Sequence, residues 1–432
     1  MTKMIKMSLI AAVAVTGMTS TVCAQPLEEA IKGVDVSGML RYRYNDKIVE
    51  TAGAAGAAST TATTQGNEYT MKVLTKAKVN DMVTANVQVE ALGVSDISSS
   101  DAHATSDATG DRDVTLSVTK ANFAANLGVA TVIAGKQSVP SPFVDNSGDD
   151  VTRGTGAVAL IPVAGMTVAA GHFVNLQVAE TAINLGNSID ALAVLGKVAD
   201  VSFDAWYVNV NGVTGGLKDT TGTTLGAKAA VAGINLDFRT SKITRTGEND
   251  SGLTKLVAST KLGAASVVAG IAMTPKDNTQ ATIDTDNDAQ SGFRLWQAST
   301  EKLNNSTAYL LGAKMEVIPG VTLGADYVAA SADVAATSTT TGVVATAYYT
   351  PGVFDATTGV TGAATLVPVS AGTTTTVAAQ TVDVSELLLT ATYAMSKNFT
   401  VHARYSMMST DYSGTTKDVD SNMGRLELKY TF

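Results

Sequence analysis

Cationic side chains recur at intervals of two or four residues in several stretches of this chain. They are Arg41, Arg43, Lys72, Lys76, Lys78, Arg404, Arg425 and Lys429. In an extended strand, residues two apart point to the same side, so each stretch presents a row of positive charge. Rows on neighbouring strands would form one basic wall, and charges that line a narrow aqueous passage act strongly on passing ions. This pattern indicates electrostatic selection of ions and polar solutes.

A second charged stretch is acidic. The segment "SVPSPFVDNSGDDVTRGTG" (138–156) carries Asp145, Asp149 and Asp150, together with Arg153. If this segment folds inward opposite the basic wall, the two create a transverse field across a constriction, which orients dipolar solutes and sets ion preference. Two alternatives stay open. Arg153 could pair with an aspartate and weaken the field, and all these charges could be solvated lumen residues away from the narrowest point.

A third stretch, "DTDNDAQSGFRL" (284–295), begins like a calcium-binding loop. Asp284, Asp286 and Asp288 occupy the first, third and fifth positions. However, Ala289 stands at the sixth position, where the loop needs glycine, and Leu295 stands at the twelfth, where it needs glutamate. A solvated acidic loop is therefore favoured over a specific site. Weak binding of a divalent cation such as calcium is the only cofactor interaction that we leave open.

The sequence shows no grouping of catalytic residues. The three histidines, His103, His172 and His402, lie far apart, and neither an HExxH nor a CxxC motif is present. A few catalytic side chains could still meet at one end of the folded chain. We nevertheless expect a protein that is not an enzyme.

The elements that position the charges follow a secretory signal. A short positive region precedes an apolar run of about ten residues (8–17), which is too short to span a bilayer. Val22 and Ala24 fit the −3 and −1 positions of a signal-peptidase site. We therefore expect residues 1–24 to be a signal peptide and residues 25–432 to form one domain.

Cleavage after Ala24 removes Cys23, the only cysteine, so neither disulfides nor thiol chemistry are expected. The alternative is a lipoprotein signal with an acylated Cys23. That signal needs a small residue just before the cysteine, and Val22 fits this requirement poorly.

Composition narrows the class of protein further. The pI of about 4.9 and the formal net charge of −9 argue against a nucleic-acid partner. No hydrophobic run after residue 24 approaches the ~20 residues of a membrane helix. Two classes remain, which are a secreted all-β protein and an outer-membrane β-barrel.

Apolar and polar residues alternate with the period of a strand in many segments, for example in "EYTMKVLTKAKVN" (68–80) and "FTVHARYSM" (399–407). Eighteen candidate strands span roughly residues 36–44, 68–80, 83–93, 113–126, 130–137, 154–162, 166–176, 188–198, 201–210, 223–232, 234–245, 253–263, 265–273, 306–316, 321–330, 384–395, 398–409 and 422–432. The strands of soluble β-sandwiches also alternate apolar and polar residues. In this chain, however, short connections between strands alternate with long ones. That order predicts a transmembrane antiparallel β-barrel of about 18 strands with short periplasmic turns and long extracellular loops.

A sheet that crosses hydrocarbon must have no free edge, because each unpaired backbone group costs several kcal/mol there. The last strand, which ends in "RLELKYTF" (425–432), must therefore pair with the first. Tyr42, Tyr44, Tyr430 and Phe432 would then face lipid near the interfacial aromatic belts, although they could also be ordinary strand aromatics. The terminal phenylalanine resembles the end signal that such barrels show to the barrel assembly machinery.

Some segments depart from the alternation. Its phase slips at Thr119–Lys120 and again at Trp206–Tyr207, and β-bulges would absorb both slips. The stretch "RLWQAST" (294–300) is assigned to a loop, since an extra strand would break the even count. Low-complexity residues 51–66 and 331–383 are expected to be exposed loops, the second with a hairpin at 343–350.

Three segments resemble a known family. "PLEEAIKGVDVSGMLRYRY" (26–44), "VIAGKQ" (132–137) and "VTLGADYV" (321–328) are similar to parts of the major outer-membrane porin of Campylobacter-type bacteria. The resemblance implies an eighteen-stranded homotrimeric porin in outer-membrane lipid, which passes small hydrophilic solutes and ions with a weak cation preference. It also implies that residues 138–156 fold into the pore.

The leading hypothesis is a passive diffusion channel that combines sieving with electrostatic bias. The alternative is a surface adhesin or structural barrel that acts through its long extracellular loops, above all residues 331–383.

Overall fold

The computed structural model describes residues 34–53, 58–99, 115–145, 151–177, 187–212, 218–276, 282–283, 289–300, 303–334, 337–341, 349–350, 354–355, 360–361, 365–366, 373–414 and 416–432. The expected signal peptide (1–24) lies outside these residues. It therefore stays a prediction.

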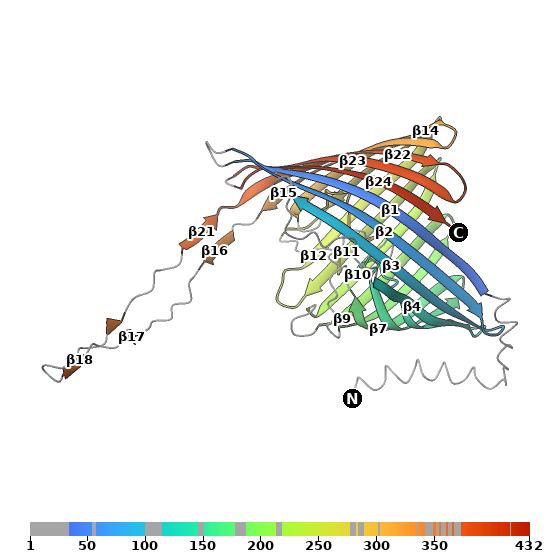
Figure 1. Ribbon diagram of the computed structural model, residues 1–432. Coiled ribbons are helices and arrows are strands. Elements are labelled where there is room, and N and C mark those ends of the chain that lie inside the picture. Colours follow the sequence, from blue (N-terminus) through green and yellow to red (C-terminus); the bar gives the residue numbers. More distant parts are fainter. Residues whose placement is uncertain are drawn as a thin grey trace.

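Eighteen antiparallel strands form one closed sheet (Figure 1). They are β1 (Val34–Thr51), β2 (Thr60–Lys78), β3 (Val83–Ser99), β4 (Thr115–Asn126), β5 (Thr131–Ser138), β6 (Arg153–Val163), β7 (Met166–Gln177), β8 (Ser188–Val198), β9 (Val201–Asn211), β10 (Thr220–Val231), β11 (Ile234–Arg245), β12 (Ser251–Leu262), β13 (Ala265–Met273), β14 (Asn304–Ile318), β15 (Val321–Val334), β22 (Gln380–Ala394), β23 (Phe399–Tyr412) and β24 (Val419–Thr431). β1 pairs with β2 on one side and with β24 on the other, so these strands close into a barrel. The predicted fold is confirmed.

The first hairpin is longer than predicted. Thr51 at the end of β1 pairs with Thr60 at the start of β2, and the ladder is continuous from there. The expectation that all of residues 51–66 form a loop is therefore wrong for 60–66. Threonine is β-branched and favours the extended conformation, so the repetitive composition of this stretch does not prevent strand pairing.

A two-stranded ribbon continues from β15 and β22 beyond the barrel (Figure 1). It consists of β16 (Thr337–Thr341) paired with β21 (Thr373–Val377), β17 (Tyr349–Thr350) with β20 (Thr365–Leu366), and β18 (Phe354–Asp355) with β19 (Val360–Thr361). Most of the hairpin expected at 343–350 lies outside the described residues. Its described part, Tyr349–Thr350, pairs with Thr365–Leu366.

β4 contains the first of the two predicted bulges. Gln88 of β3 pairs with Lys120, and the next residue, Val89, pairs with Val118. Thr119 is therefore the extra residue of a β-bulge, which restores the alternation of inward and outward side chains.

The outward face of the sheet is apolar. Tyr42, Tyr44, Tyr430 and Phe432 are between 37% and 47% exposed on this face, among many other large apolar side chains. Outward apolar side chains of a barrel contact hydrocarbon. None of the described residues forms a helix long and apolar enough to cross a membrane.

Tight turns join hairpins at one end of the barrel. In the turn at Ala164-Gly165 the φ angles are 50° and 79°. In the turn at Ala232-Gly233 they are 50° and 81°. Two consecutive positive φ angles are typical of the type I′ turn, whose twist matches that of the flanking strands. These turns correspond to the short connections expected on the periplasmic side.

The seam between β1 and β24 places the last residue over a glycine. Gly38 and Phe432 exchange two backbone hydrogen bonds, of 2.8 and 3.1 Å, and the rings of Tyr430 and Phe432 stack with centroids 6.0 Å apart. A Cβ atom on Gly38 would lie 2.5 Å from the Lys72 carbonyl oxygen and inside contact distance of the Phe432 ring. Glycine at this position thus allows the terminal ring to cover the seam.

We predict that Gly38→Val impairs closure of the barrel. Overpacking of this kind costs ~1–3 kcal/mol, and here it displaces the strand that seals the sheet. The heat-modifiable, folded fraction on a detergent gel should fall. Gly424→Ala is the matched control, since a Cβ there meets nothing closer than 3.7 Å. Equal folded fractions for the two variants would contradict the role of Gly38.

Candidate functional site

The connection after β5 turns into the barrel and packs there. We call residues 139–145 the first inward segment. Val139, Phe143 and Val144 are almost completely buried in one apolar cluster. Their partners on β6 to β11 include Val158, Phe173, Ile189, Val208, Val210 and Ile243. This part of residues 138–156 follows the expected inward course, while the constricting role of the whole loop stays a prediction.

This packing explains why the second predicted bulge is wrong. β9 pairs without interruption with β8 and β10 through Trp206 and Tyr207. The alternation slips in the sequence because Val208 and Val210 are apolar but face the inside of the barrel, where they pack against Phe143 and its neighbours. An inward position can therefore be apolar where an inward segment covers it.

A second inward segment comes from the connection between β13 and β14. Its described parts are residues 282–283 and 289–300. The Ile283 N–H donates to the Phe143 carbonyl at 2.7 Å, and the Ser291 N–H donates to the Pro142 carbonyl at 2.9 Å. The two inward segments are therefore hydrogen-bonded to each other inside the barrel.

The second inward segment also packs on the inner wall. Phe293 lies in an apolar cluster with Leu253 of β12, Ala272 of β13 and Ala308 of β14. Within residues 294–300 the only regular pairing is one isolated bridge between Arg294 and Ser299. The assignment of this stretch to a loop is confirmed.

Glu386 of β22 holds the second inward segment in place. The backbone N–H groups of Trp296, Gln297 and Ala298 all donate to its Oε2, at 3.1, 2.8 and 2.7 Å. Ser406 donates to its Oε1 at 2.5 Å, and Glu386 is fully buried. Three successive N–H groups around one carboxylate form an anion-binding nest of backbone dipoles. This contact was not predictable from the sequence, because alternation places Glu386 inward but does not reveal its partner.

The strands that carry the expected basic wall are neighbours in the order β2, β1, β24 and β23. Across the seam, Arg41 lies opposite Lys429 and Arg43 lies opposite Glu427. Lys76 lies opposite Asn86 of β3. The closed sheet therefore brings cations from both ends of the chain together.

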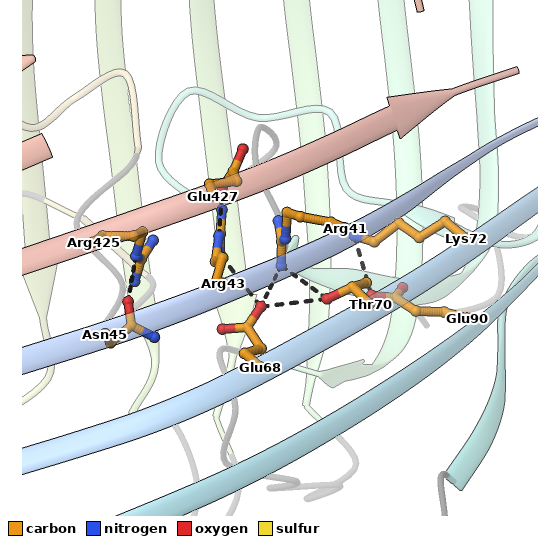
Figure 2. A network of polar contacts seen from close by, with 9 residues as sticks. All are labelled: Arg41, Arg43, Asn45, Glu68, Thr70, Lys72, Glu90, Arg425 and Glu427. Atoms are coloured by element: carbon orange, nitrogen blue, oxygen red, sulfur yellow. Dashed lines mark hydrogen bonds and ion pairs between the residues drawn. The ribbon is translucent and has the colours of Figure 1, made fainter. Parts of the chain in front are cut away.

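Carboxylates interrupt this wall (Figure 2). Arg41 forms an ion pair with Glu68 and donates to Thr70 at 2.9 Å. Arg43 lies 3.4 Å from Glu68 and 2.6 Å from Glu427. Neither glutamate was predicted to belong to the wall, although Glu68 shares the inward face of β2 with Lys72. Glu427 likewise lies between Arg425 and Lys429 on the inward face of β24. The wall is a network of ion pairs with an excess of cations.

Further along the wall, Glu90 of β3 binds two cations. Lys72 lies 3.1 Å and Arg153 lies 3.0 Å from its two carboxylate oxygens. Arg153, which begins β6, is thus an ion-pair partner of the wall. Glu90 itself is 8% exposed, so the pairing occurs largely away from bulk water.

Lys78 lies at the end of the barrel that carries the short turns. Its side chain is 54% exposed and forms a 2.8 Å ion pair with Asp81, which is 95% exposed. The hydrogen bond and the charge of Lys78 lower the pKa of Asp81 below its ordinary value. Lys78 therefore belongs to the mouth of the barrel.

Arg404 and Arg425 share one aromatic ring. The guanidinium carbon of Arg404 lies 3.6 Å from the centroid of the Trp296 ring, and that of Arg425 lies 5.4 Å from it. Cation–π contacts of this kind attach the second inward segment to β23 and β24. Trp296 was visible in the sequence only as part of a loop.

The structure separates the predicted acidic residues. Asp145 is 1% exposed, so its carboxylate belongs to the packed first inward segment. Its expected part in a field across the constriction stays a prediction. Asp149, Asp150, Asp284, Asp286 and Asp288 lie outside the described residues. Within the part of the chain that the structure describes, no three His, Cys, Asp or Glu side chains are grouped as metal ligands would be.

Comparisons with known proteins agree with this geometry. The family described as Campylobacter major outer membrane protein matches residues 2–432. The chain belongs to this family. No relative among curated proteins matches the chain.

Solved structures of Pseudomonas aeruginosa channels share the fold. OpdQ has a TM-score of 0.61 at 14% sequence identity, with 92% of this chain and 99% of that one covered. OccK2 (OpdF) in complex with glucuronate has 0.61 at 13%, with 92% and 98% covered, and OpdK with vanillate has 0.60 at 11%, again with 92% and 98% covered. Identities this low show the barrel fold alone.

The family and the closed barrel together give the function class. The protein is an outer-membrane porin, located in the bacterial outer membrane and surrounded by its lipid, and it passes solutes. It is a channel rather than an enzyme. The inward segments and the charged wall lie inside this barrel.

We predict that Glu386→Gln loosens the second inward segment. The substitution removes the charge that accepts three backbone hydrogen bonds, and hydrogen bonds to a charged group contribute about 1.5–3 kcal/mol each. Single-channel recordings should show a larger and noisier open-state conductance, while the barrel stays heat-modifiable. Glu50→Gln, at an exposed position near the end of β1, is the matched control. A quiet conductance equal to wild type would refute the anchoring role.

Proposed function

We propose that the protein works by passive diffusion, with sieving by the two inward segments and electrostatic bias from the wall. The observation that supports this most is the continuous bridge inside the barrel. It runs from the first inward segment, packed on β6 to β11, through the hydrogen bond between the Pro142 carbonyl and the Ser291 N–H, to the Glu386 anchor on β22. A solute that crosses the lumen passes beside this bridge. No energy coupling is needed for such a mechanism.

Electrostatic bias follows from the excess of cations. Four of the eight expected wall cations, Arg41, Arg43, Lys72 and Lys78, form ion pairs with four carboxylates, Glu68, Glu427, Glu90 and Asp81. Among these twelve residues 8 − 4 = 4 positive charges are left. The weak cation preference that we expect must therefore come from carboxylates elsewhere, and we propose Asp149 and Asp150 for this role. Opposite charges on two sides of a passage would orient dipolar solutes.

Small organic carboxylates are among the solutes that we propose. The excess of arginine and lysine on the wall favours them, since guanidinium groups bind carboxylates with matched geometry. The structures of OccK2 with glucuronate and of OpdK with vanillate, both organic carboxylates, are consistent with such solutes in barrels of this fold.

We make three further proposals. The family supports a homotrimer as the assembly, and the terminal Phe432 in the sealing strand supports recognition by the barrel assembly machinery. Weak calcium binding by Asp284, Asp286 and Asp288 stays open. We expect no resident cofactor.

Liposome swelling tests the function directly. The porin should admit small sugars at rates that fall with solute size, because sieving by the bridge depends on size alone for uncharged solutes. The competing proposal, a surface adhesin or structural barrel, draws on the ribbon of β16 to β21 beyond the rim. A barrel of that kind with a closed lumen would give no swelling, and this result would overturn the channel mechanism.

We predict that the double variant Asp149→Asn and Asp150→Asn lowers the cation preference. These two aspartates follow the first inward segment in the sequence, and their removal would leave the cation excess of the wall unopposed. Reversal potentials in a salt gradient across a planar bilayer measure this. Asp200→Asn is the control, since its side chain is 91% exposed in the turn between β8 and β9. An unchanged potential in the double variant would remove these aspartates from the constriction.

A further inference from the structure

Two arginines face each other on neighbouring strands inside the barrel. Arg404 of β23 and Arg425 of β24 are direct cross-strand partners. Like charges in this position destabilise a sheet. Both guanidinium groups lie against Trp296, which offsets part of this repulsion, but an aromatic ring carries no net negative charge.

The nearby carboxylates bind other groups. Glu68 pairs with Arg41 and Arg43, and Glu427 pairs with Arg43 through Oε2 (Figure 2). Among the four arginines of this cluster and these two glutamates the charge is 4 − 2 = +2. The excess falls on the Arg404–Arg425 pair, since the other two arginines form the ion pairs.

The arginine pair also lacks hydrogen-bond acceptors. Arg425 donates through Nε to Asn45, a neutral acceptor (Figure 2). Arg404 donates to no acceptor among the described residues, and its Nε is buried without a partner. A guanidinium group carries five N–H donors in a rigid fork, so most donors of this pair have no acceptor from the described part of the chain.

We propose that Arg404 and Arg425 form a binding subsite for one carboxylate group of a small organic solute during its passage. A planar carboxylate matches the guanidinium fork and would neutralise the repulsion between the two cations. The indole of Trp296 holds the Arg404 guanidinium from one face and thereby orients its edge. Binding at such a site is weak, as passage through a pore requires. The proposal deepens the proposed function and depends on it only for the passage of solute, not for binding.

Tryptophan fluorescence tests binding without transport. The chain has two tryptophans, so Trp206→Phe makes Trp296 the sole reporter in the folded, detergent-solubilised porin. Sodium propionate should give a saturable change in emission, measured at constant ionic strength against sodium chloride. Propan-1-ol, which lacks the charge, should give none. Loss of one charge-assisted hydrogen-bonding partner should weaken propionate binding ~10-fold in Arg425→Gln.

Single-channel block gives the second measurement. Propionate should reduce the wild-type current, and the reduction should require ~10-fold more propionate in Arg404→Gln. Arg404→Lys, which keeps the charge but not the fork, should fall in between. Lys261→Gln removes one positive charge from an exposed position at the end of β12 and should behave as wild type.

The outcomes separate the possibilities. Propionate effects that are equal in wild type and in both arginine variants would overturn the subsite. Inorganic phosphate that binds while propionate does not would overturn its assignment to organic carboxylates. Binding by fluorescence in a protein that gives no liposome swelling would retain the subsite and refute the channel mechanism. If a glutamine variant does not fold, two measurements still test the subsite. They are current block in Arg404→Lys and the comparison of propionate with propan-1-ol by fluorescence in Trp206→Phe.

Discussion

The structure depends on one constraint, which is that a backbone N–H or C=O in hydrocarbon must have a hydrogen-bond partner within the protein. A flat sheet has two free edges, and a closed sheet has none. Pairing of β24 with β1 meets the constraint over thirteen residue pairs, from Met39 with Thr431 to Thr51 with Val419. Closure then separates two environments, so the outward face is apolar and the inward face can carry charge.

The same constraint acts a second time inside the barrel. The two inward segments are irregular backbone within a tube, and they need partners as the strands do. In the first inward segment, the Phe143 carbonyl accepts from the Ile283 N–H and the Pro142 carbonyl accepts from the Ser291 N–H. Trp296, Gln297 and Ala298 obtain them from the carboxylate of Glu386. The passage for solutes is therefore shaped by contacts that first of all satisfy buried backbone groups.

The regular features could be predicted from the sequence because they follow from local periodicity. All eighteen strands and the bulge at Thr119 are of this kind. The closing pair was predictable for another reason, since a sheet in hydrocarbon can have no free edge. Periodicity and local composition gave wrong predictions where tertiary contacts determine which side chain or backbone conformation a position adopts. Val208 faces inward although it is apolar, since the first inward segment covers it. Residues 60–66 form a strand because β1 provides a partner, and composition alone gave no sign of this.

The candidate site was predictable only in part. The cations on β1, β2, β23 and β24 were found because an alternating charge is visible in a strand, and the closed sheet makes these strands neighbours. Their partners were not found. Trp296 and Glu386 are 90 residues apart in the sequence, and no periodic pattern relates a residue in a connection to a residue on a distant strand.

Closure of the barrel can be measured directly with a cysteine pair across the seam. Tyr44 and Leu426 are direct partners on β1 and β24. Hydrogen-bonded antiparallel pairs have Cα atoms about 5.5 Å apart, which suits a disulfide. In the mature chain, Tyr44→Cys with Leu426→Cys should form an intramolecular disulfide on mild oxidation, whereas Tyr44→Cys with Leu428→Cys, displaced by two residues, should not. Failure of the first pair to crosslink in folded protein, or equal crosslinking of both pairs, would contradict the closed sheet with this register.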